Sequence, residues 1–474
     1  MSDNLLNEKD EQQDLWEKSS RGTSFVMDLS DGMKVYCLRT TEALDVETER
    51  MGHNVVERMR DILYRTPRIY SIRDKEGNPH VTFEIRDNDV VQCRGKGDKA
   101  PAAEDMSAVQ EFIRAKNLNI RRDAVNTGLL YQDGQYWDIY NLPKNFVVKG
   151  DLDFSGLDIT QLPDLSTVTV EGDFVCSGTK ITSLKGAPKK VGGGFYCEDT
   201  QITSLEGAPQ EVGYSFCCNN TQITSLEGGP QEVGGNFYCS DNKKLTSLKG
   251  GPKKVGEEFR CCRTGITSLE GAPQEVGRDF YCVNNEQMTT LKGAPQKLKG
   301  YFYCHGTSIT SLEGAPQEVG GSFDCSGNKK LTSLKGAPKK VGEVFDCSMT
   351  QITSLEGAPQ DVNSFRCPYN EKLTTLKGAP QKLKGFFDCS KTNITSLEGA
   401  PQEVGGSFYC AYNPKLISIK GAPKKIGKEF YCYGTPLNLP MVVKIQQLLE
   451  QASSKGNSLL AQAKEWYRKQ KDSR

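Results

Sequence analysis

Two sets of residues in this chain of 474 residues have side chains that could do chemistry. The first set is His53, His80 and Glu84, near the N-terminus. Imidazole and carboxylate groups act as general acids and bases, and two histidines with one carboxylate are also a metal-ligand set. Their spacing is not that of a helical metal motif, although His80 and Glu84 would share one face of a strand. A structural or binding role is therefore favoured over catalysis and metal binding, and no cofactor is expected.

The second set comes from a motif, Phe-x-Cys, that recurs thirteen times between Phe174 and Cys432 in steps of 20 to 22 residues. The middle residue varies in character while its flanks are nearly copied; Val175 and Cys217 belong to this column, but most members are Tyr, Arg or Asp. Because Tyr and Arg are enriched at interface hot spots, a partner-binding role is favoured over a structural stripe of packed tyrosines. The predicted partner-binding residues are Tyr196, Tyr238, Arg260, Tyr281, Tyr303, Asp324, Asp346, Arg366, Asp388, Tyr409 and Tyr431.

The charge pattern favours a protein partner over a nucleic acid. The chain has 60 basic and 60 acidic residues, so no global field attracts polyanions. In the variable column, Arg260 and Arg366 bracket Asp324 and Asp346, which suits a partner of mixed charge. A nucleic-acid groove would carry more Lys and Arg along the aromatic stripe.

The elements that must position the variable column are the repeats themselves. Each repeat reads Val-x3-Phe-x-Cys-x2-(Thr/Asn)-x-(Ile/Leu)-Thr-Ser-Leu-x-Gly-Ala-Pro. The alternation over Phe-x-Cys predicts a short strand with one buried face, the Thr or Asn can bond the backbone of a turn, and the proline forbids a long helix. Leu152 and Phe154 form a fourteenth, degenerate rung. Stacked rungs of this kind predict a solenoid with an extended curved binding surface.

The repeat resembles the leucine-rich repeat, L-x-x-L-x-L-x-x-N-x-L, of the compact bacterial type. The resemblance covers residues 150–440, of which 150–437 are assigned to the repeat domain, with Phe and Cys standing where Leu is usual. It implies that Phe and Cys point inward and that the variable residue faces out on a concave sheet. The predicted fold is thus an N-terminal α+β domain followed by a leucine-rich-repeat solenoid of 13 to 14 parallel β rungs and a C-terminal helical cap.

Two further columns concern the stability of the repeat. After Ser-Leu the charge alternates from rung to rung, beginning Glu227, Lys249, Glu270, and a parallel column follows the proline. Neighbouring rungs would thus place opposite charges side by side and fix their register, an interpretation favoured over a binding stripe for a partner of alternating charge. Thirteen of the 17 cysteines occupy one position of the repeat without zinc-site spacing, which predicts buried free thiols.

Residues 22–120 predict a separate α+β domain. "RIYSIRDKEGNPHVTFEI" alternates into a hairpin, "NDVVQCRGKGDKAP" supplies a third strand and a loop, and residues 107–116 have a helical pattern. Residues 121–149 are expected to connect this domain to the repeats.

Three ordered motifs of this domain, "CLRTTEALDVETERMGHNVV", "RIYSIRDKEGNPHVTFEI" and "VVQCRGKGDKAP", resemble the PcfJ-like domain of conjugative plasmids, phages and related mobile elements. The family has Cys where this chain has Asn54, so a Cys–His nucleophile is excluded at that position. Carried over by position, the resemblance assigns the family's polar set to His53, Arg68, Arg73, His80, Glu84, Gln92 and Lys96.

The two ends of the chain are expected to lie outside these domains. Residues 1–21 are polar and acidic, which predicts a disordered segment rather than a signal peptide. Residues 438–474 carry two apolar patterns at helical spacing separated by Gly456, which predicts a cap on the last rung. With no long apolar run, a cytoplasmic location is expected, and export by a system that reads unstructured N-termini is the alternative.

These observations favour a non-enzymatic protein-recognition scaffold of a bacterium, phage or plasmid, which binds a protein partner on the concave face. One alternative is an effector delivered into another cell, with the repeats as its targeting arm. Another makes the N-terminal module an enzyme, for which nucleic acid is a candidate substrate. The oligomeric state stays open.

Overall fold

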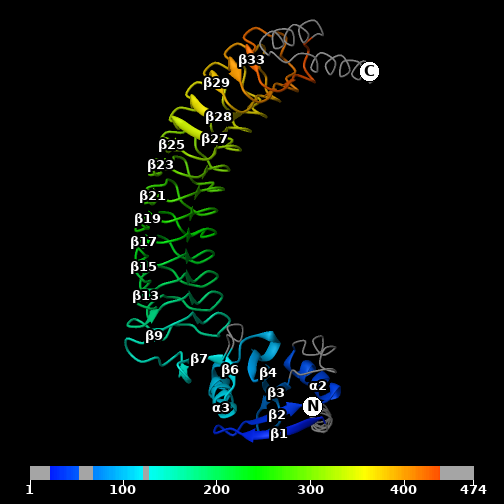
Figure 1. The fold of residues 1–474 in the computed structure, drawn as a ribbon, viewed down its shortest axis with the longest axis vertical. Helices are drawn as coiled ribbons and strands as arrows, with labels where there is room; N and C mark the ends of the chain where they lie inside the picture. Colours follow the sequence, from blue (N-terminus) through cyan, green and yellow to red (C-terminus); the bar gives the residue numbers. More distant parts are fainter. Residues whose placement is uncertain (1–21, 53–67, 121–126, 438–474) are drawn as a thin grey trace, which may run out of the picture. The chain divides into compact units, whose positions relative to one another are not determined.

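The structure is a computed structural model that describes residues 22–52, 68–120 and 127–437 (Figure 1). The chain forms two compact units, Met1–Val212 and Gly213–Arg474. The predicted disordered segment at 1–21 and the predicted helical cap at 438–474 lie outside the described residues. In the described part of the chain, no helix is both long and apolar enough to cross a membrane.

The first unit begins with a six-stranded sheet in which neighbours in sequence are neighbours in space. All pairs are antiparallel except the last, β5 with β6, which is parallel. The predicted hairpin and third strand are confirmed. The strands are β1 (Thr23–Asp28), β2 (Lys34–Leu38), β3 (Arg68–Arg73), β4 (Pro79–Arg86), β5 (Asp89–Arg94) and β6 (Asn119–Ile120).

Two α-helices pack on this sheet, α2 (Thr41–Met51) and α3 (Met106–Lys116). The predicted helix at 107–116 is therefore confirmed. Phe112 of α3 places its ring 5.1 Å from Phe83 and 5.3 Å from Tyr70, on the sheet. Two short 3-10 helices, η2 (Lys96–Asp98) and η3 (Ala103–Asp105), link β5 to α3. The α+β class predicted for this module is confirmed by these elements.

The segment predicted as a connector contains a hairpin, β7 (Leu129–Gln132) with β8 (Gln135–Asp138). Tyr136 packs against the core of the α+β domain and donates a hydrogen bond to the carbonyl oxygen of Leu118. On the other side, the Trp137 ring lies 4.7 Å from that of Phe146. The hairpin therefore contacts both the α+β core and the residues that lead into the first rung.

Each turn of the repeat contributes two short strands, and within a unit most strands pair in parallel with their counterpart one turn later. We call those that begin with the conserved Phe the Phe strands, and the others the Val strands. In the first unit, Leu152 aligns with Phe174 and Phe154 is fully buried, which confirms the fourteenth rung. The Phe strands here are β10 (Leu152–Asp153), β12 (Phe174–Val175) and β14 (Phe195–Tyr196); the Val strands are β9 (Val147–Val148), β11 (Thr169–Val170), β13 (Lys190–Val191) and β15 (Glu211–Val212).

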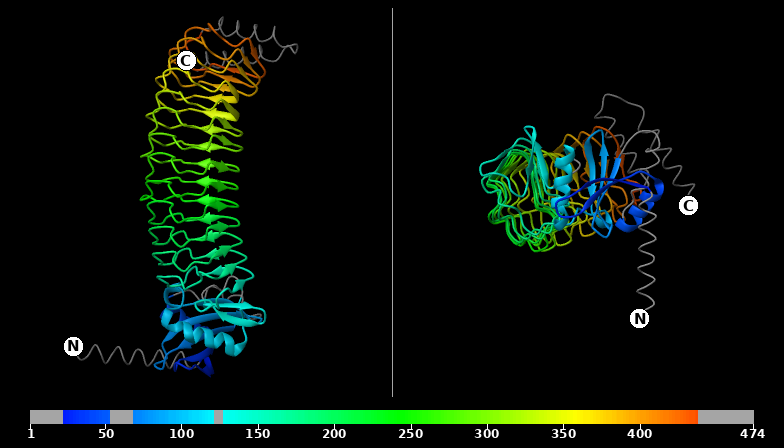
Figure 2. Two further views of the ribbon diagram at one scale, coloured as in Figure 1. Left: turned by 90° about the vertical axis from the view of Figure 1, so that its left-hand side faces the viewer. Right: turned by 90° about the horizontal axis from the view of Figure 1, so that it is seen from below.

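In the second unit the rungs follow one another along the sheet, as the green to orange segments of Figure 2 show. Strands β27 (Lys340–Asp346) and β28 (Asp361–Arg366) are long enough to belong to both columns. The other Phe strands are β16 (Phe216–Cys217), β18 (Phe237–Tyr238), β20 (Phe259–Arg260), β22 (Phe280–Tyr281), β24 (Phe302–Tyr303), β26 (Phe323–Asp324), β30 (Phe387–Asp388), β32 (Phe408–Tyr409) and β34 (Phe430–Tyr431).

The Val strands of the second unit form a column that the sequence pattern had not predicted. Each consists of one charged residue, exposed except for the partly exposed Glu403, followed by a buried aliphatic residue, so a pair of residues is enough to join neighbouring turns. They are β17 (Glu232–Val233), β19 (Lys254–Val255), β21 (Glu275–Val276), β23 (Lys297–Leu298), β25 (Glu318–Val319), β29 (Lys382–Leu383), β31 (Glu403–Val404) and β33 (Lys425–Ile426).

The core of the repeat is a stack of phenylalanines beside a column of cysteines. The rings of Phe323 and Phe345 lie 5.4 Å apart with an interplanar angle of 7°, and other neighbours stack similarly. Cys325 is fully buried, as are all thiols of the column except the terminal Cys432, which is 6% exposed. The predicted inward orientation of Phe and Cys is confirmed, and every cysteine is free. One expectation was wrong: Cys217, predicted to face outward, is buried.

The alternating charges pair across rungs as predicted. After Ser-Leu, Lys292 lies 2.6 Å from Glu270, and Lys335 lies 2.7 Å from Glu313. In the parallel column, Lys297 lies 2.6 Å from Glu318. These side chains are largely exposed, so solvent screens each pair and its contribution to stability is small. Their main effect is on register, because a slip of one rung would bring like charges together.

Candidate functional site

The variable residues of the Phe strands form the surface that sequence analysis selected. The strand pleat sends Phe and Cys inward and the residue between them outward. In the second unit these outward residues are partly or largely exposed, apart from Cys217. We call the surface formed by residues 238, 260, 281, 303, 324, 346, 366, 388, 409 and 431 the strand face. Tyr196, the remaining predicted residue, is partly exposed in the first unit.

Arg260 is held between two tyrosine rings. Its guanidinium carbon lies 5.2 Å from the ring centroid of Tyr238 and 4.5 Å from that of Tyr281. Its Nη2 and Nε donate to Oε2 of Glu258 at 2.6 and 2.9 Å. Burial and the neighbouring Glu258 carboxylate raise the pKa of Tyr238 to about 12. These contacts fix a planar cation and two aromatic rings in one arrangement before any partner binds.

The aromatic stripe continues onto the next rung. Tyr281 and Tyr303 stack with centroids 5.0 Å apart and an interplanar angle of 15°. Tyr301, which directly precedes Phe302 of β24, places its ring 5.8 Å from that of Tyr303. Its column was not singled out from the sequence, although it also alternates outward. This column could have been found from the sequence, because side chains alternate along a strand. The residue before Phe therefore points to the same face as the residue after it.

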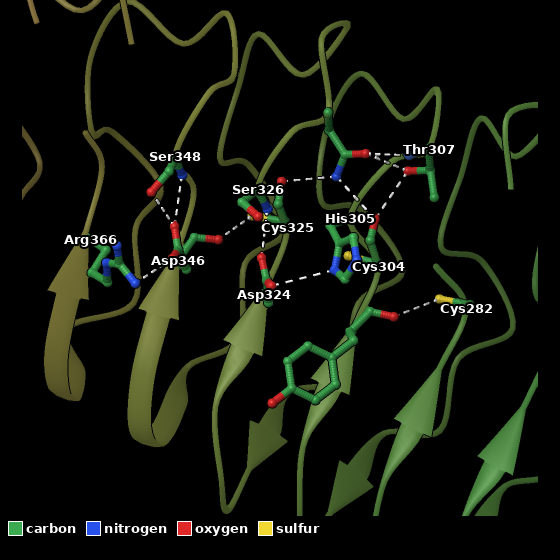
Figure 3. Close-up of polar contacts among 12 residues, drawn as sticks. Cys282, Cys304, His305, Thr307, Asp324, Cys325, Ser326, Asp346, Ser348 and Arg366 are labelled. Atoms are coloured by element: carbon green, nitrogen blue, oxygen red, sulfur yellow. Dashed lines mark hydrogen bonds and ion pairs between the residues drawn. The ribbon is translucent and has the colours of Figure 1, made fainter. Parts of the chain in front are cut away.

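Two aspartates lie side by side where the stripe ends, and each contacts one basic side chain. Asp324 and Asp346 are register partners on β26 and β27. Figure 3 shows the ring of His305 directed at Asp324 and the guanidinium of Arg366 directed at Asp346. His305 Nδ1 lies 3.4 Å from Asp324 Oδ2, and Arg366 Nη1 lies 3.5 Å from Asp346 Oδ2. Of the two arginines that bracket these aspartates in the column, Arg366 contacts Asp346, whereas Arg260 contacts Glu258.

The pKa values at this place follow the local contacts. The contact with the Asp324 carboxylate raises the pKa of His305, although burial acts in the opposite direction. Burial acts to raise the pKa of Asp324, but the contact with His305 and the hydrogen bond from Ser326 outweigh it and lower the pKa. At Asp346 burial prevails over the hydrogen bonds from Ser348 and raises the pKa. The two carboxylates therefore differ in acidity although they occupy equivalent positions on adjacent rungs.

The strand face ends in a second aromatic group. Asp388 is the register partner of both Arg366 and Tyr409. The rings of Tyr409 and Tyr431 stack at 4.7 Å with an interplanar angle of 3°. The ring of Phe386, from the column before the conserved Phe, stands edge-on to Tyr409 at 6.4 Å. The strand face thus carries aromatic residues at both ends and charged residues between them.

The polar set of the N-terminal module is only partly brought together. Arg73 is buried and donates to Glu47 at 2.9 Å, whereas Arg68 is exposed at the start of β3. Glu84 is the register partner of Gln92 and accepts from Arg86. His53 lies outside the described residues. Among the described residues, no group of three His, Cys, Asp or Glu side chains is placed to hold a metal ion.

His80 and Lys96 line a common cleft of about 770 Å³ in the first unit. His80 Nδ1 lies 2.9 Å from Oδ1 of the buried Asp105, and its Nε2 lies 3.5 Å from Asp74 Oδ2. The cleft also contains Lys180, paired with Asp158 at 2.7 Å. Sequence analysis had joined His80 to His53 and Glu84; the structure instead gives it two aspartates, one of them 25 residues away. Their proximity had no sequence signal.

Solved structures resemble part of this chain at low sequence identity. No family model and no curated protein matches the chain. YopM from Yersinia enterocolitica is 18% identical over 61% of this chain and 74% of its own, with a TM-score of 0.36. A functional domain of InlJ from Listeria monocytogenes, which includes a cysteine ladder, is 20% identical, with a TM-score of 0.31; the match covers 63% of this chain and 61% of that domain. The parallel rungs of residues 150–437 themselves form a β-solenoid with two short strands in each turn.

Proposed function

We propose that this chain is a non-enzymatic recognition scaffold that binds a protein partner through the strand face. The repeat supplies a rigid support, because every rung is bonded to the rungs before and after it within its unit. Tyrosines would act as apolar anchors, and Arg and Asp would orient the partner. We further propose that the strand face is the concave side of the solenoid.

One observation carries this proposal: Arg260 is already fixed between Tyr238 and Tyr281. A side chain held in place before binding loses little conformational entropy when a partner arrives. Tyr and Arg are also the residue types that dominate interface hot spots. A strand face whose only purpose was structural would not require an arginine sandwiched between aromatic rings.

The charges of the strand face support a protein partner. Both arginines are engaged by carboxylates, Arg260 by Glu258 and Arg366 by Asp346. Cations neutralised in this way contribute little to binding phosphates, which depends on the release of counterions by free positive charge. A protein surface with both signs of charge fits this pattern better.

The proposal for the N-terminal module rests on its sequence motifs. We propose that residues 22–120 are a PcfJ-like domain and that the protein belongs to a bacterium, phage or plasmid. In support, the motifs Arg-Ile-Tyr-Ser-Ile-Arg and Pro-His-Val-Thr-Phe-Glu-Ile-Arg coincide with β3 and β4. We also propose a cytoplasmic location, with delivery into another cell as the alternative.

The experiment that tests the strand face compares two triple variants as bait in affinity capture from a bacterial lysate. In the first, Tyr238, Tyr281 and Tyr303 are each changed to Ser, the residue found at outward position 322. In the second, Lys254, Lys297 and Lys340 on the Val strands are each changed to Ser. Proteins captured by the wild type are identified, purified and titrated against all three baits.

We expect at least one purified partner to bind the wild type and the lysine variant equally and the tyrosine variant at least about a hundredfold more weakly. Equal binding by all three baits would contradict the strand-face proposal. The enzymatic alternative predicts instead that His80→Asn abolishes an activity of the protein without lowering the yield of folded chain.

A further inference from the structure

One position of the rung has a left-handed backbone conformation throughout the repeat. It lies four residues after the conserved Phe, and its φ is between +51° and +70° in all thirteen rungs. Glycine, Asn and Asp are the residues that adopt this conformation with little strain. Eight of the thirteen rungs have one of them: Gly178, Asp199, Asn220, Asp241, Asn284, Gly306, Gly327 and Gly434.

Five rungs carry a bulky residue at this position instead. Arg263 is accounted for by its contacts, because its Nε and Nη2 donate to Asp241 of the preceding rung at 2.5 and 2.7 Å. The other four occupy consecutive rungs: Met349, Tyr369, Lys391 and Tyr412. Met349 is 53% exposed, Tyr369 52% and Tyr412 50%. Asn or Gly would adopt this backbone conformation with less strain. Packing and backbone geometry therefore do not explain these side chains.

These four residues form a surface that we call the turn ladder. Lys391 Nζ lies 4.5 Å from the ring centroid of Tyr369 and 5.4 Å from that of Tyr412, and it donates to Tyr369 Oη at 2.9 Å. Tyr412 is also fixed on its other side, where the ring of Tyr433 stands edge-on at 4.9 Å. The two exposed rings are therefore held on alternate rungs by an ammonium group between them.

We propose that the turn ladder binds a proline-rich peptide segment in the polyproline II conformation, with an acidic residue among its prolines. Alternate rungs of a parallel sheet are about 9.5 Å apart. A polyproline II helix repeats every three residues, over about 9.3 Å. Prolines three positions apart would thus lie over Tyr369 and Tyr412, and an acidic side chain between them would meet Lys391. Such a segment is already extended and rigid, so it binds with a small loss of entropy.

The turn ladder is independent of the strand face. Its residues lie in the turn that follows each Phe strand, two positions beyond the cysteine, and no residue of the ladder belongs to the variable column. Substitutions in one surface can therefore be made without changing a residue of the other.

The test uses the full chain and a fluorescein-labelled peptide of four Pro-Pro-Glu repeats, with a Gly-Ser-Glu peptide of equal length as control. Binding is measured by fluorescence anisotropy. We expect the proline peptide alone to bind, Tyr369→Asn or Tyr412→Asn to weaken binding about tenfold, and the double variant to abolish it. Because Asn already occupies this position at Asn220 and Asn284, both variants should fold at least as well as the wild type.

Two matched controls separate this surface from others. Tyr281→Ser on the strand face should leave peptide affinity unchanged. Lys391→Asn should weaken binding of the Pro-Pro-Glu peptide more than binding of a Pro-Pro-Gln peptide. Equal affinity of the wild type for the proline and Gly-Ser peptides would overturn the proposal, as would full binding by the double Asn variant. Binding of cellohexaose through Tyr369 and Tyr412, without peptide binding, would also overturn it and identify a carbohydrate platform.

Discussion

Asn328 joins two successive rungs through Thr307. Its Oδ1 accepts hydrogen bonds from the backbone nitrogen and the hydroxyl of Thr307, at 2.6 and 2.8 Å. Its Nδ2 donates to the carbonyl oxygens of Cys304 and Cys325, at 3.1 and 2.9 Å. The Asn and the Thr are both buried. The same contacts recur in four other Thr–Asn couples: 221 with 242, 264 with 285, 350 with 370 and 392 with 413.

The same couples of rungs share a salt bridge on the outside. The rung of Thr307 carries Glu313 and that of Asn328 carries Lys335, whose side chains lie 2.7 Å apart. The repeated unit of structure is therefore a pair of rungs, joined inside by Asn and Thr and outside by Lys and Glu. This explains why the sequence alternates with a period of two rungs.

The first prediction is that Asn328→Ala destabilises the protein by about 3 kcal/mol, because it removes the side chain that bonds the buried backbone nitrogen of Thr307 and the carbonyl oxygen of Cys325. Lys329→Ala, an exposed neighbour, should change the free energy of unfolding by less than about 0.5 kcal/mol. Urea denaturation measures both. Equal stability of the two variants would mean that the Asn–Thr contacts do not hold the rungs together.

The second prediction concerns backbone strain. Met349→Asn should stabilise the protein by about 1 kcal/mol, because Asn adopts the left-handed conformation more readily than Met. Asn284→Ala, at the equivalent position of another rung, should cost a similar amount. Thermal unfolding of both variants checks the pair. A loss of stability in Met349→Asn would show that the methionine makes a structural contribution.

The third prediction is that stability falls as pH rises above about 9. Burial raises the pKa of Cys304, Cys325 and their neighbours well above the ordinary thiol value, and that of the terminal Cys432 to about 11. The folded state thus keeps its thiol protons while the unfolded state loses them from about pH 8.5 upward. Stability is fully present below that pH and is lost as pH rises toward the folded pKa values. Urea denaturation at pH 7, 9 and 10 measures the effect.

A thiol reagent gives an independent check on the same cysteines. At pH 7.5 the thiols of Cys304 and Cys325 should be unreactive in the folded protein and should react at once in denaturant, because only the thiolate attacks. Rapid labelling of either cysteine in the native protein would contradict the predicted buried column.

The fourth prediction concerns His305. Its pKa is raised by Asp324, so its imidazole should titrate above the ordinary value of about 6.5. Asp324→Asn should bring the pKa back down. The protonated form adds stability that is fully present below pH 6.5 and is lost as pH rises through the folded pKa. With three histidines in the chain, NMR titration resolves the signal, and a pKa unchanged by Asp324→Asn would exclude this pairing.

The fifth prediction concerns the buried ion pair of the α+β domain. Glu47 accepts hydrogen bonds from Arg73 and from the hydroxyl of Thr82, both at 2.9 Å, and all three residues are buried. Arg73→Met should destabilise the domain by about 3–5 kcal/mol, because it leaves a carboxylate buried without a cation. The double variant with Glu47→Leu should recover much of that loss. Additive losses in chemical denaturation would argue against a direct interaction.

The sequence by itself determined the repeat. Every rung meets nearly the same neighbours, so one local pattern suffices to specify strand, turn, buried Phe and Cys, and paired charges. The hairpin of β3 and β4 and the helix α3 could be predicted for a similar reason. The spacing of apolar residues that specifies each of them lies within the segment itself. The period of two rungs was visible in the Glu–Lys alternation, but its inner counterpart, the bridge from Asn328 to Thr307, required knowing which residues face each other across rungs.

Only the tertiary structure decided the contacts made by residues that are distant in sequence. His80 meets Asp105, and Arg73 meets Glu47, because separate elements fold together, and no spacing signals these pairs. Cys217 occupies the strand position that faces outward in other rungs, yet it is buried. Tyr369 and Tyr412 have a left-handed backbone conformation. The sequence indicates it only indirectly, because equivalent positions of other rungs hold Gly or Asn. Local patterns fix which face of a rung a residue takes, whereas its partners depend on how the whole chain packs.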